Sequence, residues 1–396
     1  MKFDAVIDRK SNFSAKYDEV GKKFGREDLI PLWIADMDFK TADPIIEAIQ
    51  KRAEQGIFGY TSRPDSYFEA VSQWLEKRHG WKADPGLMIH SPGVVPSLSM
   101  IIQNFTQPGD KIIIQPPVYY PFFDVVRSNG RTLVENPLKI VEGRYEMDYD
   151  QLEQIAQKGA KLLLLCSPHN PVGRVWTKNE LLRLGEICIS YGICVVADEI
   201  HSDLVFSGHK HIPFAMISEA FRQNTITCIA PSKTFNLAGL QASIVIFSKE
   251  TDKTRFDDAL GTLDIRRNNC FSLVASEAAY RYGAEWLAGV LKYIEGNFAF
   301  IQDFCQKHMP QIQPNYPEGT YLVWFDCRGL GMNKEKLHDF MVNEAKLALD
   351  DGYWFSDAYA GFMRLNAACP RSIIAAALQQ WENAVNKLLL AARKDS

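Results

Sequence analysis

The segment Lys161-Leu-Leu-Leu-Leu-Cys-Ser-Pro-His-Asn-Pro-Val-Gly173 joins a short apolar run to a polar, proline-rich stretch. An apolar run of this length, bounded by turn residues, is typical of a buried strand. Similar runs recur at residues 111–115, 193–197, 225–229 and 242–247. Segments with helical periodicity lie between them, as at 96–105 and 179–191. This alternation predicts an α/β fold with a largely parallel sheet.

The helix expected at 179–191 has a start signal of its own. Thr177 precedes it, and Glu180 follows Thr177 at the Thr-x-x-Glu spacing. This spacing is typical of a capping box, in which each side chain binds the backbone amide of the other residue. We therefore expect Thr177 to be the N-cap of this helix.

Length and composition indicate a folded protein with more than one domain. The chain has 396 residues, of which 46% are hydrophobic, and a formal net charge of −4. From Trp286 onward the pattern changes to a long helix, a proline-rich turn, a strand at 320–325 and two further helices. We therefore expect a large domain at 46–285 and a smaller α+β domain at 286–396, which the N-terminal segment 1–45 joins.

Charge and hydropathy exclude several classes of partner. No block of like charges points to nucleic acid or to an anionic membrane surface. The apolar run at 162–166 is far shorter than the roughly 20 residues of a spanning helix, and the first ten residues have no apolar signal core. We expect a cytoplasmic protein that binds a small molecule.

The cysteines and histidines are scattered along the chain. The eight Cys form no Cys-x-x-Cys pair, so we expect reduced core thiols. His209 and His211 lie close together in a polar stretch without a third ligand nearby, and we expect a solvated loop there rather than a metal site.

Polar residues follow three of the expected strands. Asn170 follows the run at 161–166, Asp198 the run at 193–197, and Lys233 the run at 225–229. The carboxyl ends of parallel strands meet at one edge of a sheet, where ligands bind. A partly desolvated lysine can form an imine with an aldehyde cofactor, and an aspartate can keep a pyridine nitrogen protonated. Each residue alone is more often solvated or caps a helix, so the argument depends on their combination.

An anion site is indicated independently. Ser91-Pro-Gly-Val-Val-Pro96 stands at the start of an expected helix, where free amides and the helix dipole favour an anion. A lysine, an aspartate and an anion site together call for a phosphorylated aldehyde that contains a ring. Pyridoxal 5′-phosphate (PLP) meets that description.

Several segments resemble the fold-type I PLP enzymes of the aspartate aminotransferase superfamily, and among them the cystathionine β-lyase-like carbon–sulfur lyase branch. The resemblance implies the PLP-dependent transferase-like fold and covers nearly the whole chain. Residues 33–39 and 91–96 resemble the lyase branch in particular. The remaining segments that carry the resemblance are residues 58–60, 167–173, 198–201, 230–241 and 362–371.

The resemblance implies a role for each residue around the cofactor ring. Lys233 is implied to be the Schiff-base lysine and later the base at the substrate Cα, and Asp198 the partner of the ring nitrogen. Asn170 donates to the ring oxygen, and Tyr119 stacks on the ring face. His201 stands where many aminotransferases have a tyrosine near that oxygen.

The resemblance also implies how the phosphate and the substrate are bound. Tyr60 reaches the phosphate from the partner subunit, which implies a homodimer with shared active sites. Arg364 binds the carboxylate of an amino-acid substrate, with Trp33 and Asn170 beside it. Gln241 stands where aminotransferases commonly have an arginine on the phosphate. The remaining phosphate ligands are Ser232 and the amides of Gly93, Val94 and Val95.

The expected reaction is β-elimination of cystathionine or a related cysteine thioether, which gives a thiol, pyruvate and ammonia. Such an enzyme belongs to methionine and cysteine metabolism. Two alternatives remain open at this point: a PLP-dependent aminotransferase of amino acids, and a PLP-bound regulatory protein.

Overall fold

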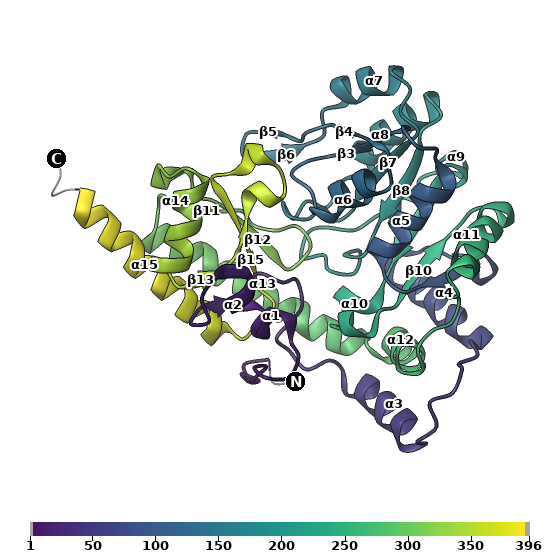
Figure 1. The fold of residues 1–396 in the computed structure, drawn as a ribbon, viewed down its shortest axis with the longest axis horizontal. Coiled ribbons are helices and arrows are strands. Elements are labelled where there is room, and N and C mark those ends of the chain that lie inside the picture. The colour runs from purple at the N-terminus through teal and green to yellow at the C-terminus, as the bar shows by residue number, and fades with distance from the viewer. Residues whose placement is uncertain (1–2, 393–396) are drawn as a thin grey trace. The chain divides into compact units, whose positions relative to one another are not determined.

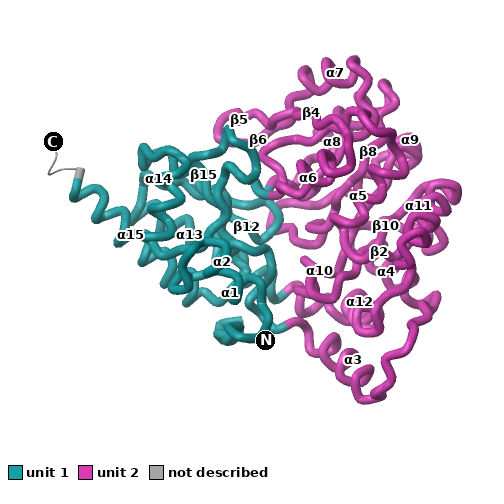
Figure 2. Tube along the Cα trace, viewed as in Figure 1, with its two compact units in different colours: residues 1–40, 171–173, 289–396 teal, residues 41–170, 174–288 magenta. Residues whose placement is uncertain are grey.

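A computed structural model describes residues 3–392, which divide into two compact units (Figure 2). Unit 1 contains the residues up to Lys40, residues 171–173 and the residues from Gly289 onward. Unit 2 contains Thr41–Asn170 and Arg174–Ala288. Residues 171–173 belong to unit 1, although the chain on both sides of them belongs to unit 2.

Unit 2 is built on a seven-stranded sheet in the order β2-β10-β9-β8-β7-β3-β4. Figure 1 labels β3, β4, β7, β8 and β10 of this sheet. The strands from β9 to β4 pair in parallel, and β10 is antiparallel to both of its neighbours. The α/β fold with a largely parallel sheet is confirmed, but β2 and β4 were missed. The strands are β2 (Met88–Ser91), β3 (Lys111–Ile114), β4 (Thr132–Glu135), β7 (Leu162–Cys166), β8 (Cys194–Asp198), β9 (Thr225–Ile229) and β10 (Ser243–Ile246).

Helices connect these strands, and a small hairpin lies apart from the sheet. The hairpin consists of β5 (Lys139–Val141) and β6 (Arg144–Glu146). The helices of unit 2 are α3 (Asp43–Glu54), α4 (Asp65–His79), α5 (Val94–Phe105), α6 (Pro121–Ser128), α7 (Tyr149–Gln157), α8 (Lys178–Ser190), α9 (Glu219–Gln223), α10 (Pro231–Thr234), α11 (Glu250–Thr262) and α12 (Cys270–Tyr282).

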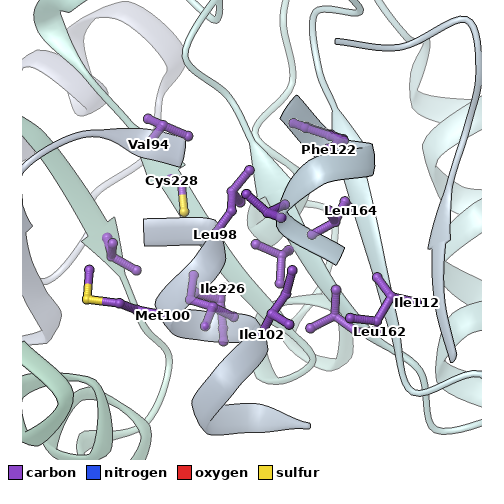
Figure 3. Close-up of a cluster of buried hydrophobic side chains, with 14 of the residues drawn as sticks. Val94, Leu98, Met100, Ile102, Ile112, Phe122, Leu162, Leu164, Ile226 and Cys228 are labelled. Atoms are coloured by element: carbon purple, nitrogen blue, oxygen red, sulfur yellow. The ribbon is translucent and has the colours of Figure 1, made fainter. Parts of the chain in front are cut away.

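The apolar face of α5 packs on the sheet and anchors the helix (Figure 3). Residues one helical turn apart share this face, and a buried aliphatic cluster of this size is the main source of stability in such a domain. Because the packing fixes α5 along its length, it also fixes its first turn beside the end of β2. The cluster includes Val94, Leu98 and Ile102 from α5, Phe122 from α6, and Ile112, Leu164 and Ile226 from the strands.

The register of the parallel strands places the carboxyl ends of β7, β8 and β9 side by side. Cys166 is paired with Asp198, and Asp198 is paired in turn with Cys228 near the end of β9. The loops after β7, β8 and β9 therefore leave the sheet side by side at one edge.

Unit 1 contains a four-stranded antiparallel sheet in the order β11-β12-β15-β14. The strand expected at 320–325 is β12, but its neighbour β15 was missed. The strands are β11 (Gln313–Pro314), β12 (Leu322–Asp326), β14 (Asp350–Asp351) and β15 (Phe362–Asn366), with a separate parallel pair of β1 (Ile30–Pro31) and β13 (Leu347–Ala348). Helices α1 (Ala15–Asp18), α2 (Val20–Phe24), α14 (Lys334–Asp339) and α15 (Arg371–Ala392) belong to unit 1, as does most of α13 (Ala284–His308).

Two further expectations concern the chain as a whole. All eight cysteines are free thiols, and most of them are buried, as expected. Among residues 3–392, no helix is both long and apolar enough to cross a membrane.

The capping box of α8 is present as expected. The Thr177 hydroxyl accepts from the Glu180 amide at 3.3 Å, and Glu180 Oε2 accepts from the Thr177 amide at 2.7 Å. Thr177→Ala should therefore lower the free energy of unfolding by about 1 kcal/mol, because a first-turn amide loses its acceptor. Urea unfolding followed by circular dichroism measures the change. Thr177→Ser keeps the hydroxyl and is the control, so equal losses in both variants would contradict this role.

Candidate active site

Lys233 lies on α10, a single helical turn that follows β9. The turn is anchored by its next residue, because the Thr234 hydroxyl donates to Asp203 Oδ2 at 2.9 Å. Asp203 also accepts from Trp74 Nε1 at 3.1 Å and lies 3.0 Å from His79 Nε2. Burial favours the neutral acid, but His79, the charge of Arg78 and the Thr234 hydroxyl together hold the pKa of Asp203 below its usual range. Asp203 thus fixes the backbone that presents Lys233, a role the sequence analysis missed.

Asp198 ends β8 and is almost fully buried. Its Oδ1 accepts a hydrogen bond from the Ile200 amide at 3.1 Å. Burial raises the pKa of Asp198 to about 7, although the Ile200 amide and the charge of Lys233 both lower it. Burial makes the ionised form of Asp198 unfavourable, so a cation next to the carboxylate would stabilise that form. A protonated pyridine nitrogen is such a cation.

His211 is not solvated, so the expectation of a solvated loop at residues 209–211 was wrong for this residue. His211 is buried, and its Nε2 lies 3.1 Å from Glu199 Oε2. Glu199 also accepts from the Phe214 amide at 2.8 Å. A buried carboxylate needs such partners, which explains why the histidine turns inward while His209 remains exposed.

The loops after β3 and β7 are tied together next to Asn170. His169 Nε2 lies 2.8 Å from the Pro117 carbonyl, and burial lowers the pKa of His169 to about 4, so the neutral ring donates this bond. Asn170 is buried, and its backbone amide donates to Cys166 Sγ at 3.4 Å. Tyr119 is half-buried after β3 and packs against the core cluster under α5.

The first turn of α5 has the features of an anion cradle. Gly93 is the N-cap, so no side chain accepts from the amides of Val94 and Val95. Its φ of 155° favours glycine, and a Cβ there would lie 3.3 Å from Pro96 Cδ. Free amides at the start of a twelve-residue helix favour a phosphate.

The remaining residues expected around the cofactor all lie in unit 2. Ser232 is half-buried on α10 beside Lys233, and His201 is buried in the turn after β8. Gln241 is exposed in this single chain and adopts a φ of 51°.

Tyr60 stands on an exposed segment between α3 and α4. It is 97% exposed, so its own chain covers almost none of the side chain. The segment is nevertheless held in place, because Arg267 NH1 donates to the Thr61 carbonyl at 3.1 Å and its guanidinium lies 5.9 Å from the Tyr60 ring centre. Arg63 donates to Asn268 Oδ1 at 2.8 Å.

Arg364 lies in unit 1, in the middle of β15, and is buried. Its NH2 donates to the Trp33 carbonyl at 2.9 Å and to Asp350 Oδ2. Trp33 thus contacts Arg364 through its backbone, since its indole Nε1 donates to the Lys16 carbonyl at 2.9 Å. Asp350 was not identified from the sequence, because its own strand is only two residues long.

Buried and half-buried ion pairs fix residues 33–39, the segment whose Trp33 carbonyl contacts Arg364. Asp38 accepts from Arg9 NH1 at 2.6 Å and from Lys16 Nζ at 2.7 Å, and Lys16 is fully buried. Asp36 accepts from Arg9 NH2 at 2.8 Å. The two aspartates of this segment are therefore structural anchors.

Taken together, the residues of unit 2 fit PLP. They provide a lysine next to a half-buried serine, a buried carboxylate without a full counter-charge, and a helix N-terminus capped by a glycine.

Comparisons with known proteins agree with this geometry. The family model for aminotransferase class I and II matches residues 27–380. Cystathionine β-lyase PatB of Bacillus subtilis (strain 168) is 43% identical over 93% of this chain and 96% of its own length. Cystalysin of Treponema denticola, solved with PLP, has a TM-score of 0.95 at 36% identity, covering 98% of this chain and 99% of its own.

A third relative has a different assignment. A PLP-bound protein of Clostridium difficile 630, provisionally assigned as an aminotransferase, has a TM-score of 0.95 at 49% identity. It covers 97% of this chain and 99% of its own. The family match spans well over half of the chain, and these relatives align with it almost end to end. The chain belongs to the aminotransferase class I and II family.

Proposed function

We propose that this protein is a PLP-dependent carbon–sulfur β-lyase of the cystathionine β-lyase type. It eliminates a thiol from cystathionine or a related cysteine thioether and leaves pyruvate and ammonia. The observation that carries the proposal is the 43% identity to PatB over 93% of the chain. The likeness to cystalysin and the fit of the unit 2 residues to PLP support it.

Residues of unit 2 hold the cofactor. Lys233 would attach it, Asp198 would bind the ring nitrogen, Asn170 would donate to the ring oxygen, and Tyr119 would cover a ring face. When bound, PLP supplies an aldehyde for the substrate amine and a ring that accepts the electron pair left at Cα. The phosphate and the rest of the ring are bound by Ser232, His201 and the first-turn amides Gly93, Val94 and Val95.

Side chains of the protein then direct the reaction. Lys233 Nζ would remove the Cα proton, and Asp198 would keep the nitrogen of a bound PLP ring protonated, which would make the ring a better acceptor of electrons. Arg364 binds the substrate carboxylate, and Trp33 and Asn170 are the other residues assigned to the substrate. A sulfur at Cβ can then leave as a thiolate.

The second candidate is an amino-acid aminotransferase. It is favoured by the 49% identity to the Clostridium difficile protein. Both reactions share the steps up to removal of the Cα proton, so they differ only in the fate of the electron pair at Cα. His201 and Gln241, which stand where aminotransferases commonly have a tyrosine and an arginine, favour the lyase.

We also propose a homodimer that shares its active sites and acts in the cytoplasm. Ile57, Phe58 and Tyr60 form an apolar exposed stretch, with exposures of 70%, 59% and 97%. A second copy covering it would bury these side chains and bring Tyr60 to the phosphate of the neighbouring site.

The reaction itself distinguishes the two candidates. With cystathionine, the purified holoenzyme should release pyruvate and thiol in equal amounts, because elimination produces one of each. Coupled lactate dehydrogenase and a thiol reagent measure them. Lys233→Ala should abolish both. Amino-group exchange between an amino acid and a keto acid, without pyruvate from cystathionine, would instead establish the aminotransferase.

Asp198→Ala should retain the cofactor and lose most of the rate. Removing one electrostatic stabiliser of a transition state costs about 10²- to 10³-fold, and Asp198 stabilises the charged ring. The cofactor absorbance and the rate of pyruvate formation are measured together. Asp198→Glu keeps a carboxylate and should lose less. A turnover of Asp198→Ala near that of the wild type would refute the role of this carboxylate.

A mixed dimer tests the shared site. Lys233→Ala and Tyr60→Phe each carry one defect, and a dimer made from both variants contains one site with both residues intact. Activity should therefore rise above the average of the two parents after they are unfolded and reassembled together, provided that Tyr60→Phe alone is impaired. If Tyr60 instead serves its own chain, every site keeps one defect and no rescue occurs.

A further inference from the structure

The nitrogen of Arg364 that a two-point contact with a carboxylate requires, NH2, already donates two hydrogen bonds. A guanidinium binds a carboxylate at two points along either of two edges, and both edges include NH2, the terminal nitrogen that points away from Cδ. The two hydrogens of NH2 are donated to the Trp33 carbonyl and to Asp350 Oδ2. A substrate carboxylate can therefore bind Arg364 at two points only after one of these acceptors leaves.

The Trp33 carbonyl is firmly held by its surroundings. Asn366 Nδ2 donates to the Ile34 carbonyl at 2.7 Å, and the Tyr321 hydroxyl donates to the Ala35 carbonyl at 2.8 Å. The ion pairs of Asp36 and Asp38 hold the same segment further along the chain. Moving this backbone would break several bonds at once.

Asp350 is much less constrained. Its Oδ1 is buried without a hydrogen-bond partner among the described residues, so Arg364 provides the main hold on its carboxylate. A carboxylate with one satisfied oxygen is the acceptor that leaves at lower cost.

Burial and the adjacent Asp351 favour the neutral form of Asp350, whereas the charges of Arg364 and Lys23 oppose it. Arg364 faces it from β15, Asp351 is its neighbour on β14, and Lys23 faces it from α2. Asp351 itself binds His338 Nδ1 of α14 at 2.8 Å. Burial, the largest effect, raises the pKa of Asp350 to about 6, even with the opposing charge of Arg364 beside it. Sharing that charge with a second carboxylate raises the pKa further.

We propose that Asp350 is an internal carboxylate that occupies Arg364 until the substrate carboxylate displaces it, and that Asp350 takes up one proton from solvent on displacement. The ionised carboxylate and one proton become the neutral acid, so Arg364 balances only one negative charge at a time. The inference rests on the proposed function, in which Arg364 binds the substrate carboxylate.

Displacement makes carboxylate binding depend on pH. Above about pH 6 Asp350 is ionised in the free protein and protonated in the complex, so binding consumes a proton. Affinity then falls as pH rises and approaches a tenfold loss per pH unit, whereas below about pH 6 it levels off. A neutral amide analogue cannot take the place of the carboxylate and should bind without proton uptake.

Calorimetry on the holoenzyme tests this with 3-(methylthio)propanoate, which has the carboxylate and thioether but no amine to react with the cofactor. Titrations near pH 7.5 in buffers of different ionisation enthalpy count the protons taken up. The wild type should take up about one proton, and its affinity should fall close to tenfold per unit between about pH 6.5 and 8.5. Asp350→Asn should take up none and bind with little pH dependence over this range.

Asp351→Asn is the matched control, because it removes the adjacent buried carboxylate, which contacts His338 rather than Arg364. Near pH 7.5 it should take up about one proton, as the wild type does, because Asp350 and Arg364 are both retained. Equal proton uptake in the wild type and in Asp350→Asn would overturn the inference. If Asp350→Asn does not fold, a wild type that binds without proton uptake would overturn it equally.

Arg364→Met separates this inference from the proposed function. If it binds the probe as tightly as the wild type does, Arg364 is not the carboxylate ligand, and the inference fails together with that part of the proposed function. If it loses binding while Asp350→Asn keeps the proton uptake, only the inference about Asp350 fails.

Discussion

The parallel register of β7, β8 and β9 is the constraint on which the site depends. Because Cys166, Asp198 and Cys228 are neighbours across the strands, the loops that carry Asn170 and Lys233 start on either side of Asp198. A slip of one residue in β8 would turn Asp198 to the opposite face of the sheet. The cluster under α5 protects this register, since β8 contributes the buried Val196 to it and the slip would turn this side chain away.

Buried carboxylates in this protein fall into two groups, and the difference indicates their roles. Asp203, Glu199 and Asp38 have histidine, arginine, lysine or amide partners, so they fix backbone and loops. Asp198 has a neighbouring amide and the more distant charge of Lys233, and its pKa is raised. A fully paired buried carboxylate stabilises the structure, whereas an incompletely paired one can still bind a cationic group of a ligand.

Sequence patterns predicted those features that depend on local signals. The predictions of the α8 capping box and of strands β7, β8 and β9 are confirmed. They depend on the Thr-x-x-Glu spacing and on short apolar runs bounded by turn residues. Strand β15 was missed because Arg364 interrupts its apolar pattern, although every one of its residues is buried. His211 was assigned wrongly and Asp350 was not noticed, because their partners Glu199 and Arg364 lie 12 and 14 residues away in the sequence. Pairing between charged residues that are far apart in the sequence produces no repeating pattern from which it could be predicted.

A buried arginine that receives an anionic substrate presents an energetic conflict. Without a counter-ion, burial of the Arg364 charge would cost several kcal/mol, and a permanent counter-ion would weaken the site for the substrate. A fully paired aspartate such as Asp38 would be a permanent counter-ion. Asp350 differs, because it holds Arg364 through Oδ2, while its other oxygen has no partner within the described part of the chain, and its burial favours the neutral acid. Its carboxylate can therefore compensate Arg364 in the free protein and give up its charge when another carboxylate arrives.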